Sequence, residues 1–152
     1  MLKRPTEAFK FELANYIKNQ LDISDLIAGY DIKGLNLSNS IIRTIQRAHE
    51  NLTNINWSRC IIGYEGANNF LTGCNISYGN FKYCRIIGML SLKRVIAHRT
   101  NFADAYMPDI EYQHADLTDS TFCNVVVPMG SLKGHGAIIP MSQIEKWGIN
   151  LK

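Results

Sequence analysis

The sequence lacks most of the features that mark a membrane segment, a metal centre or a nucleotide site. No apolar run reaches the roughly 18 residues that a spanning helix requires, and residues 1–4 lead into charged sequence rather than into the apolar segment of a signal peptide. The four cysteines include no Cys-x-x-Cys pair, so their spacing does not match a zinc site. No phosphate loop, dinucleotide fingerprint or paired-carboxylate motif is present. These absences predict a cytoplasmic protein, or a virion component if the chain comes from a phage, that needs no metal or cofactor.

Lysine and arginine are absent from residues 101–127, although that stretch contains five acidic residues. Through residue 100 the chain instead has 13 Lys and Arg against 7 Asp and Glu. The net charge of +3 therefore conceals a basic earlier part and an acidic later part. The five acidic residues are Asp104, Asp109, Glu111, Asp116 and Asp119. This asymmetry either serves a binding surface or is ordinary solvated charge, and the sequence leaves both interpretations open.

Apolar residues recur every five positions between residues 100 and 127. A small or β-branched residue lies two positions before each of them. A period of five fits neither the 3.6 of a helix nor the 2 of a strand, so it predicts the turns of a repeating array. With one irregular repeat near residues 63–70, the same phase can be followed from Ile32 and predicts about 20 repeats. The apolar anchors of the regular stretch are Phe102, Met107, Tyr112, Leu117, Phe122 and Val127.

Three triplets resemble the core motif of the pentapeptide-repeat family: Cys74-Asn75-Ile76, Thr100-Asn101-Phe102 and Ala115-Asp116-Leu117. The resemblance implies a right-handed quadrilateral β-helix with about 20 residues in each coil, one repeat on each side, and the anchor and small residue pointing inward. We therefore expect an all-β solenoid of about five coils.

We expect one domain in three parts. Residues 1–24 would form an N-terminal helical cap, residues 25–127 the repeat array, and residues 128–152 a C-terminal cap with irregular structure and a short helix. Each cap would cover the edge strands and apolar core at one end of the array. A partner-binding tail is the alternative for the last segment.

Residues 6–21 read as an amphipathic helix. Thr6 can cap its N-terminus, and Glu7 lies in the first turn, where the helix dipole favours an acid. A lid on the array is the expected role, and a partner helix or a membrane surface is the alternative. The residues expected on the apolar face are Phe9, Leu13, Tyr16, Ile17 and Leu21.

Stacking coils of regular length predicts which side chains lie above one another. One column would contain Ile42, Ile62, Phe81, Phe102 and Phe122, and another would contain Leu37, Trp57, Ile76, Ala97 and Leu117. Arg47 and Glu50 fall at inward positions, where an unpaired charge would be costly, so we expect the turn to bulge outward or the two residues to pair.

The cysteines are predicted to be structural thiols. Cys60, Cys74 and Cys84 fall at the small inward position on three different sides of the array, and Cys123 falls on an outward position. This placement predicts reduced, space-filling thiols at the three inward positions.

No histidine belongs to a complete catalytic constellation. His98 and Thr100 form one His-x-Thr pair, but the chemistry of two-histidine phosphoesterases needs a second pair, which is absent. His135 has Ser131 nearby but no recognisable third member. Because the regular sides of such an array are flat rather than concave, the sequence predicts no enzyme activity.

The charged residues around position 95 are the candidates for partner binding. We expect four of them to cluster along one edge of the fourth coil, namely Lys93, Arg94, His98 and Arg99. Arg59 and Lys33 would lie on neighbouring coils, and Asp104, Asp109, Glu111, Asp116 and Asp119 would make the final coil acidic. The sequence thus favours a non-catalytic protein–protein interaction or structural module, an adaptor or an assembly component, that binds a protein partner or its own copies as a homo-oligomer.

The family resemblance implies one alternative function. Some pentapeptide-repeat proteins mimic duplex DNA and modulate DNA gyrase or another type II topoisomerase, which calls for a long and strongly acidic rod. This chain is short, with a calculated pI near 8.7. Direct nucleic-acid binding through Lys93, Arg94 and Arg99 would need more phosphate contacts than this small patch offers.

Overall fold

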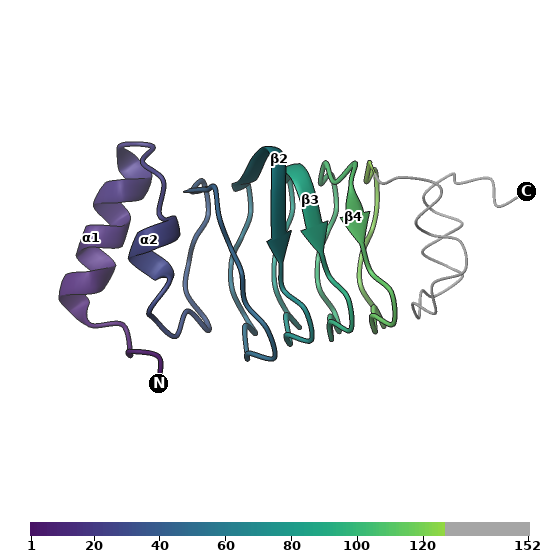
Figure 1. Cartoon of the computed structure of the whole chain (residues 1–152), viewed down its shortest axis with the longest axis horizontal. Coiled ribbons are helices and arrows are strands. Elements are labelled where there is room, and N and C mark those ends of the chain that lie inside the picture. The colour runs from purple at the N-terminus through teal and green to yellow at the C-terminus, as the bar shows by residue number, and fades with distance from the viewer. Residues whose placement is uncertain (127–152) are drawn as a thin grey trace, which may run out of the picture.

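The computed structural model describes residues 1–126 of the chain. Two short helices come first, α1 (Glu7–Lys18) and α2 (Ser24–Ile27). Four parallel strands follow in one sheet of order β1-β2-β3-β4, namely β1 (Ile41–Ile42), β2 (Ile61–Phe70), β3 (Arg85–Ser91) and β4 (Ile110–Glu111). Figure 1 shows the helices at one end and the successive turns of the chain stacked along the long axis.

The expected all-β quadrilateral solenoid is wrong as a description of this fold. The described residues form one four-stranded sheet and two helices, and elsewhere successive turns are joined by isolated parallel bridges rather than by strands on four sides. The cause is local. In the regular turns a left-handed residue recurs about every five positions, so no extended segment there is long enough to become a strand. The predicted C-terminal cap lies outside the described residues.

Each regular turn is built from the same tight bend. The carbonyl of Trp57 accepts a hydrogen bond from the N–H of Cys60 at 3.1 Å, and Arg59 between them has φ 57°. A β-turn of type II requires such a positive φ at its third position. We call these left-handed residues corners. The corners with side chains include Asn39, His49, Asn54, Arg59, Tyr78, Tyr83, Arg94, Arg99, Asp104, His114, Asp119 and Asn124.

Asparagine and aspartate stabilise these bends from the outside. Asn56 Oδ1 accepts a hydrogen bond from the N–H of Ser58 at 3.0 Å, which satisfies a backbone donor that the bend leaves unpaired. The same bond, from a side-chain oxygen to the N–H two residues later, recurs around the molecule. It is made by Asp31, Asn36, Asn51, Asn75, Asn80, Asn101 and Asp116.

The core is a set of stacked apolar columns, and the expected stacking of Phe81, Phe102 and Phe122 is confirmed. Their ring centroids lie 5.1 Å and 4.8 Å apart. The next ring in this column, however, is Trp57 rather than the expected Ile62. Ile62 pairs with Ile42, as expected, but its partner on the other side is Ile86 rather than Phe81.

The second expected column is also wrong at one position. Ile76, Ala97 and Leu117 follow one another, as expected, but Leu52 precedes them in place of Trp57. The cause is an enlarged turn at β2, where Ile61 pairs with Arg85 and the register shifts between Gly63 and Asn68. Gly63 is required there, because an added Cβ would lie 2.0 Å from the carbonyl oxygen of Ile87. The expected columns assumed a turn of about 20 residues here, whereas the structure inserts several more residues between Ile61 and Arg85.

Arg47 occupies an inward position and is buried, with 5% of its surface exposed. The expected pairing is confirmed: its guanidinium donates to Glu50 Oε2 at 2.7 Å. It also donates to the carbonyl oxygens of Ile27 and Tyr30, at 2.6 Å and 3.1 Å. Arg47 therefore ties the segment around α2 to the stacked turns.

The predicted N-terminal helix is confirmed as α1. Thr6 caps it by accepting a hydrogen bond from the N–H of Phe9 at 3.1 Å, and Phe9 and Leu13 are buried. Leu21 is half exposed, contrary to expectation, because the helix ends at Lys18 and no longer directs this side chain to the core. No helix within residues 1–126 has the length and apolar character needed to cross a membrane.

Asp22 joins the helical end to the first strand. Its Oδ1 accepts hydrogen bonds from the N–H and hydroxyl of Ser24 and from the N–H of Arg43. Burial alone would raise the pKa of this carboxyl, but the bonds from Ser24 and Arg43 hold the pKa below its ordinary value.

The burial expected for Cys60, Cys74 and Cys84 is confirmed, and Cys123 is only partly buried. Their expected distribution over three sides is wrong, because the enlarged turn at β2 places Cys84 next to Cys60 in one column. The Sγ of Cys60 donates to the carbonyl oxygen of Leu37 at 3.0 Å, and the Sγ of Cys84 donates to that of Trp57 at 2.6 Å. Burial raises the pKa of the Cys84 thiol.

Candidate interaction surfaces

Four of the predicted basic residues do lie together on one turn. Arg94 and Arg99 are successive corners, and Lys93 and His98 each precede one of them. Both arginines are exposed, and Ile96 between them is 41% exposed. This part of the expected basic edge is present in the structure.

The other two basic residues lie elsewhere. Arg59 occupies a corner on a different side, where its guanidinium lies over the ring of Tyr83, 5.3 Å from the ring centroid. Lys33 lies in the same column as His98, but three turns away. Thr53 and Ser77 occupy the two turns between them. The expected continuous basic edge is therefore limited to one turn.

The acidic residues of the last turns pair with the basic turn rather than forming a separate acidic end. Lys93 Nζ lies 3.1 Å from Glu111 Oε2, and His98 Nε2 lies 2.6 Å from Asp116 Oδ2. The Lys93–Glu111 ion pair partly neutralises the basic turn, and the His98 ring forms a hydrogen bond with the Asp116 carboxylate. The expected axial separation of charge is correspondingly weakened.

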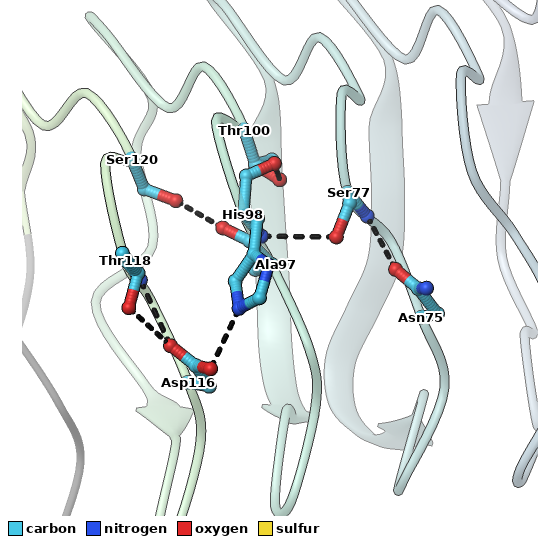
Figure 2. A network of polar contacts seen from close by, with 8 residues as sticks. All are labelled: Asn75, Ser77, Ala97, His98, Thr100, Asp116, Thr118 and Ser120. Atoms are coloured by element: carbon cyan, nitrogen blue, oxygen red, sulfur yellow. Dashed lines mark hydrogen bonds and ion pairs between the residues drawn. The ribbon is translucent and has the colours of Figure 1, made fainter.

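Asp116 is the most connected of these acids, as Figure 2 shows. Its Oδ2 bonds to the His98 ring, and its Oδ1 accepts from the N–H and hydroxyl of Thr118 at 3.1 Å and 2.5 Å. The hydrogen bond with His98 is the main reason that the pKa of Asp116 is lowered, and Thr118 adds to the effect.

The remaining acids are dispersed. Asp104 Oδ1 accepts a hydrogen bond from Asn124 Nδ2 at 3.2 Å, on the corner column of Arg59. Asp119 is the corner that follows Arg99 in the next turn, and Asp109 accepts a backbone hydrogen bond from Leu90. These acids thus face several sides of the molecule.

The network in Figure 2 holds hydroxyl, imidazole and carboxylate groups but does not form a nucleophile and base. Ser77 Oγ accepts from the backbone N–H of His98, at 3.0 Å, and Ser120 Oγ donates to the carbonyl of Ala97. Thr118 donates to Asp116. None of these hydroxyls bonds to the His98 ring, so the arrangement serves to hold successive turns together.

A second surface, which the sequence reasoning missed, combines tyrosine and arginine. Ile61, Arg85, Tyr106 and Val126 pair in sequence across four turns, all with their side chains exposed. Tyr83 lies beside this column, and we call the whole surface the tyrosine face. Its members are Arg59, Ile61, Lys82, Tyr83, Arg85, Tyr106 and Val126.

Cationic side chains make cation–π contacts with both tyrosine rings of the tyrosine face. The guanidinium of Arg85 lies 5.9 Å from the ring centroid of Tyr106. Arg59 and the Lys82 ammonium lie 5.3 Å and 5.0 Å from that of Tyr83. Such contacts stabilise the rings at the surface, where both tyrosines remain exposed.

The signal for the tyrosine face was present in the sequence. Each residue of its main column directly follows a small or β-branched inward residue, as Arg85 follows Cys84 and Tyr106 follows Ala105. Only the error in register at β2 kept Ile61 from being aligned with Arg85 and Tyr106.

No protein-family model and no curated protein matches the chain.

Proposed function

We propose that this chain is a non-catalytic protein–protein interaction or structural module, an adaptor or an assembly component, that binds another protein through the tyrosine face. The observation that carries the proposal is the ladder of exposed Ile61, Arg85, Tyr106 and Val126 with Tyr83 beside it. Tyrosine and arginine are the residues that most often dominate binding energy at protein interfaces.

The geometry of the tyrosine face suits a protein partner. Tyr83, Tyr106 and Val126 have exposed fractions of 47%, 43% and 50%, so each offers apolar surface that a partner can cover. The arginine contacts already restrict the tyrosine rings, so less side-chain entropy is lost on association. Since Arg59, Lys82 and Arg85 are all cationic, the matching partner surface would carry acidic residues at its rim.

Mimicry of duplex DNA has weaker support. A mimic needs a row of free carboxylates, whereas Glu111 pairs with Lys93 and Asp116 pairs with His98. The resemblance to pentapeptide-repeat proteins stays a proposal, because it rests on three sequence triplets and on the five-residue period of the array. We propose the cytoplasm, or a virion in the case of a phage, as the place where the module acts.

Site-specific crosslinking tests the proposal. A photoreactive phenylalanine analogue placed at Tyr106 should capture a protein partner, or a second copy of the chain, that the same analogue at Asn54 does not capture. Asn54 is an exposed corner away from the tyrosine face and serves as the matched control. Equal capture at both positions would contradict the proposal.

A second variant links capture to the chemistry of the surface. Arg85→Ala removes the cation over Tyr106 and should reduce capture at Tyr106, whereas Arg94→Ala removes an exposed cation elsewhere and should not. Sedimentation velocity of the uncrosslinked protein then separates self-association from binding of another protein. Capture that survives Arg85→Ala unchanged would count against the tyrosine face.

A further inference from the structure

A groove lies between α1, at the end of the stack in Figure 1, and the first turn at residues 34–39. Its volume of about 590 Å³ is within the range of binding pockets in proteins. We call it the edge groove. Its lining includes Lys10, Leu13, Ile17 and Lys18 from α1, and Leu35 and Asn36 from the turn.

The backbone of Asn36 is unpaired on the side of the groove. Asn56, the next residue of its column, donates its N–H to the carbonyl oxygen of Leu35 at 3.0 Å and accepts from the N–H of Leu37 at 2.8 Å. The later members of this column repeat both bonds with the turn before them. Asn36 is the first member, and within residues 1–126 its backbone N–H and carbonyl make no hydrogen bond.

The N-terminal segment covers the first turn at other positions. Asp22 pairs with Ile41, whose carbonyl oxygen accepts a hydrogen bond from the N–H of Ile23 at 2.9 Å. Lys3 pairs with Tyr30 in a second parallel bridge. Opposite Asn36 the chain instead forms α1, and the backbone groups within a helix are already bonded to one another. Asn36 is therefore an open edge position that an extended segment can extend.

The groove is apolar at its floor and cationic at its rim. Lys18 makes no ion pair within residues 1–126. Lys10 pairs with Glu7, but the Glu7 side chain is 92% exposed, so solvent weakens this pair. No Asp or Glu belongs to the lining that the described residues form. The apolar floor is made by Leu13, Ile17 and Leu35.

These charges favour a different protein as the occupant. Two copies of the chain that met through this edge would bring their Lys10 and Lys18 side chains together, and like charges facing each other are destabilising. Residues 127–152 contain three lysines and a single glutamate, so they do not complement the rim either. An acidic segment of another protein does complement it.

We propose that the edge groove binds an extended, acidic segment of a partner protein as an added parallel strand. One carbonyl of the segment accepts from the backbone N–H of Asn36, and an N–H two residues later donates to the carbonyl of Asn36, as Leu35 and Leu37 do for Asn56. Its apolar side chains cover the floor, and its carboxylates lie near Lys18. No lining residue belongs to the tyrosine face, and the proposal does not rest on the function proposed for that face.

Amide hydrogen exchange followed by NMR tests the open edge directly. In the free protein the backbone amide of Asn36 should exchange at least about tenfold faster than that of Asn56, which is hydrogen-bonded. The capped peptide Glu-Val-Glu-Val-Glu should give saturable shifts around Asn36 and slow its exchange. An Asn36 amide that is already protected without peptide would overturn the proposal. Protection that rises with protein concentration would assign the edge to a second copy instead.

Two changes to the peptide test the mode of binding. The capped peptide Lys-Val-Lys-Val-Lys should bind at least about tenfold more weakly, because its charges oppose those of the rim. In a strand, successive backbone N–H groups point to opposite edges. Methylation of single backbone nitrogens should therefore weaken binding about tenfold at the nitrogen that faces Asn36 and by less than about twofold at the next one. Equal binding of both peptides, or equal effects of methylation at both nitrogens, would overturn the added strand.

Two charge reversals in the protein test the place of binding. Lys18→Glu should weaken binding of the acidic peptide by about fivefold or more, since an attraction becomes a repulsion. Arg99→Glu makes the same change of charge at an exposed corner three turns away and should leave the affinity within about twofold of wild type. Circular dichroism of both variants checks that α1 is retained. Equal losses in the two variants would show general attraction of anionic peptides and overturn the site.

Discussion

The indole ring of Trp57 stacks on the ring of Phe81, with centroids 5.4 Å apart and an interplanar angle of 11°. Phe102 and Phe122 continue this column through the next two turns. Aromatic pairs in offset stacks stabilise a core beyond the area that they bury. The column therefore fixes the register between the turns before the enlarged turn at β2 and those after it.

The aromatic column predicts a large cost for losing one ring. Phe102 is 1% exposed and lies between Phe81 and Phe122, so Phe102→Ala should lower the free energy of unfolding by about 3–5 kcal/mol. Denaturant unfolding followed by circular dichroism measures this change. Tyr83→Ala, which removes an exposed ring, is the control and should cost less than about 1 kcal/mol. Equal losses would contradict the column.

The buried Arg47 should contribute strongly to stability. Arg47→Ala leaves Glu50 and the carbonyls of Ile27 and Tyr30 without their donor, at an expected cost of about 3–5 kcal/mol. Thermal unfolding measures the effect. The exposed Arg99→Ala should change stability by less than about 0.5 kcal/mol. A melting temperature of Arg47→Ala close to wild type would show that this residue does not join the helical end to the turns.

The pair of Asp116 and His98 predicts a dependence of stability on pH. The pKa of Asp116 is lowered in the folded chain, so its ionised form stabilises the fold above the pKa of the unfolded chain. That contribution is lost as the pH falls below about 4 and through the lower folded pKa. Between pH 5 and pH 2.5, wild type should therefore lose more stability than Asp116→Asn, which keeps the acceptor for Thr118. The measurement is denaturant unfolding at each pH.

Asp119→Asn supplies the control for the pH series. It removes an acid from the same turn whose carboxylate has no hydrogen bond within residues 1–126. Its loss of stability with acid should follow that of wild type. If Asp116→Asn also follows wild type, the His98 pair contributes nothing to the acid sensitivity.

The thiols should differ in reactivity. Burial raises the pKa of Cys74 and Cys84. The hydrogen bond with Cys84 lowers the pKa of Cys60, but Cys60 is wholly buried and out of reach, so all three should react slowly with a thiol reagent under native conditions. Cys123 is partly exposed and should react first. Mass spectrometry of the modified protein gives the order. All four should react rapidly in denaturant, and equal rates in the native protein would contradict this placement.

The five-residue period predicted local burial well. Anchors such as Phe102 and Met107 are buried because each bend directs the same position inward, and the period records this directly. The stacking partners of Ile62 and Trp57 could not be predicted in the same way. A count along the sequence cannot distinguish a deleted residue from an inserted bulge, and the bulge after Gly63 depends on its close approach to Ile87.

The same limit applies to the candidate surfaces. Lys93 and Arg94 are neighbours in sequence, so their proximity was predictable. The contacts of Arg59 with Tyr83 and of Lys93 with Glu111 cross between turns, and they depend on the register and on side-chain reach. The sequence also gave no indication that most extended segments would be too short to form strands. The left-handed corners that interrupt them recur at a spacing that fits a regular β-array equally well.

The parallel bridges connect each turn only to its immediate neighbours, as in the series Asn36, Asn56, Asn80, Asn101 and Thr121. During synthesis, which proceeds at roughly 5–20 residues per second, a nascent chain therefore never has to wait for a distant segment to emerge. Each newly exposed turn finds its hydrogen-bonding partner already in place on the preceding turn, beginning from the helical end. The turns can thus fold one after another as the chain leaves the ribosome. A truncated chain would keep its earlier turns, and the backbone hydrogen-bonding groups of its last turn would be exposed and unpaired.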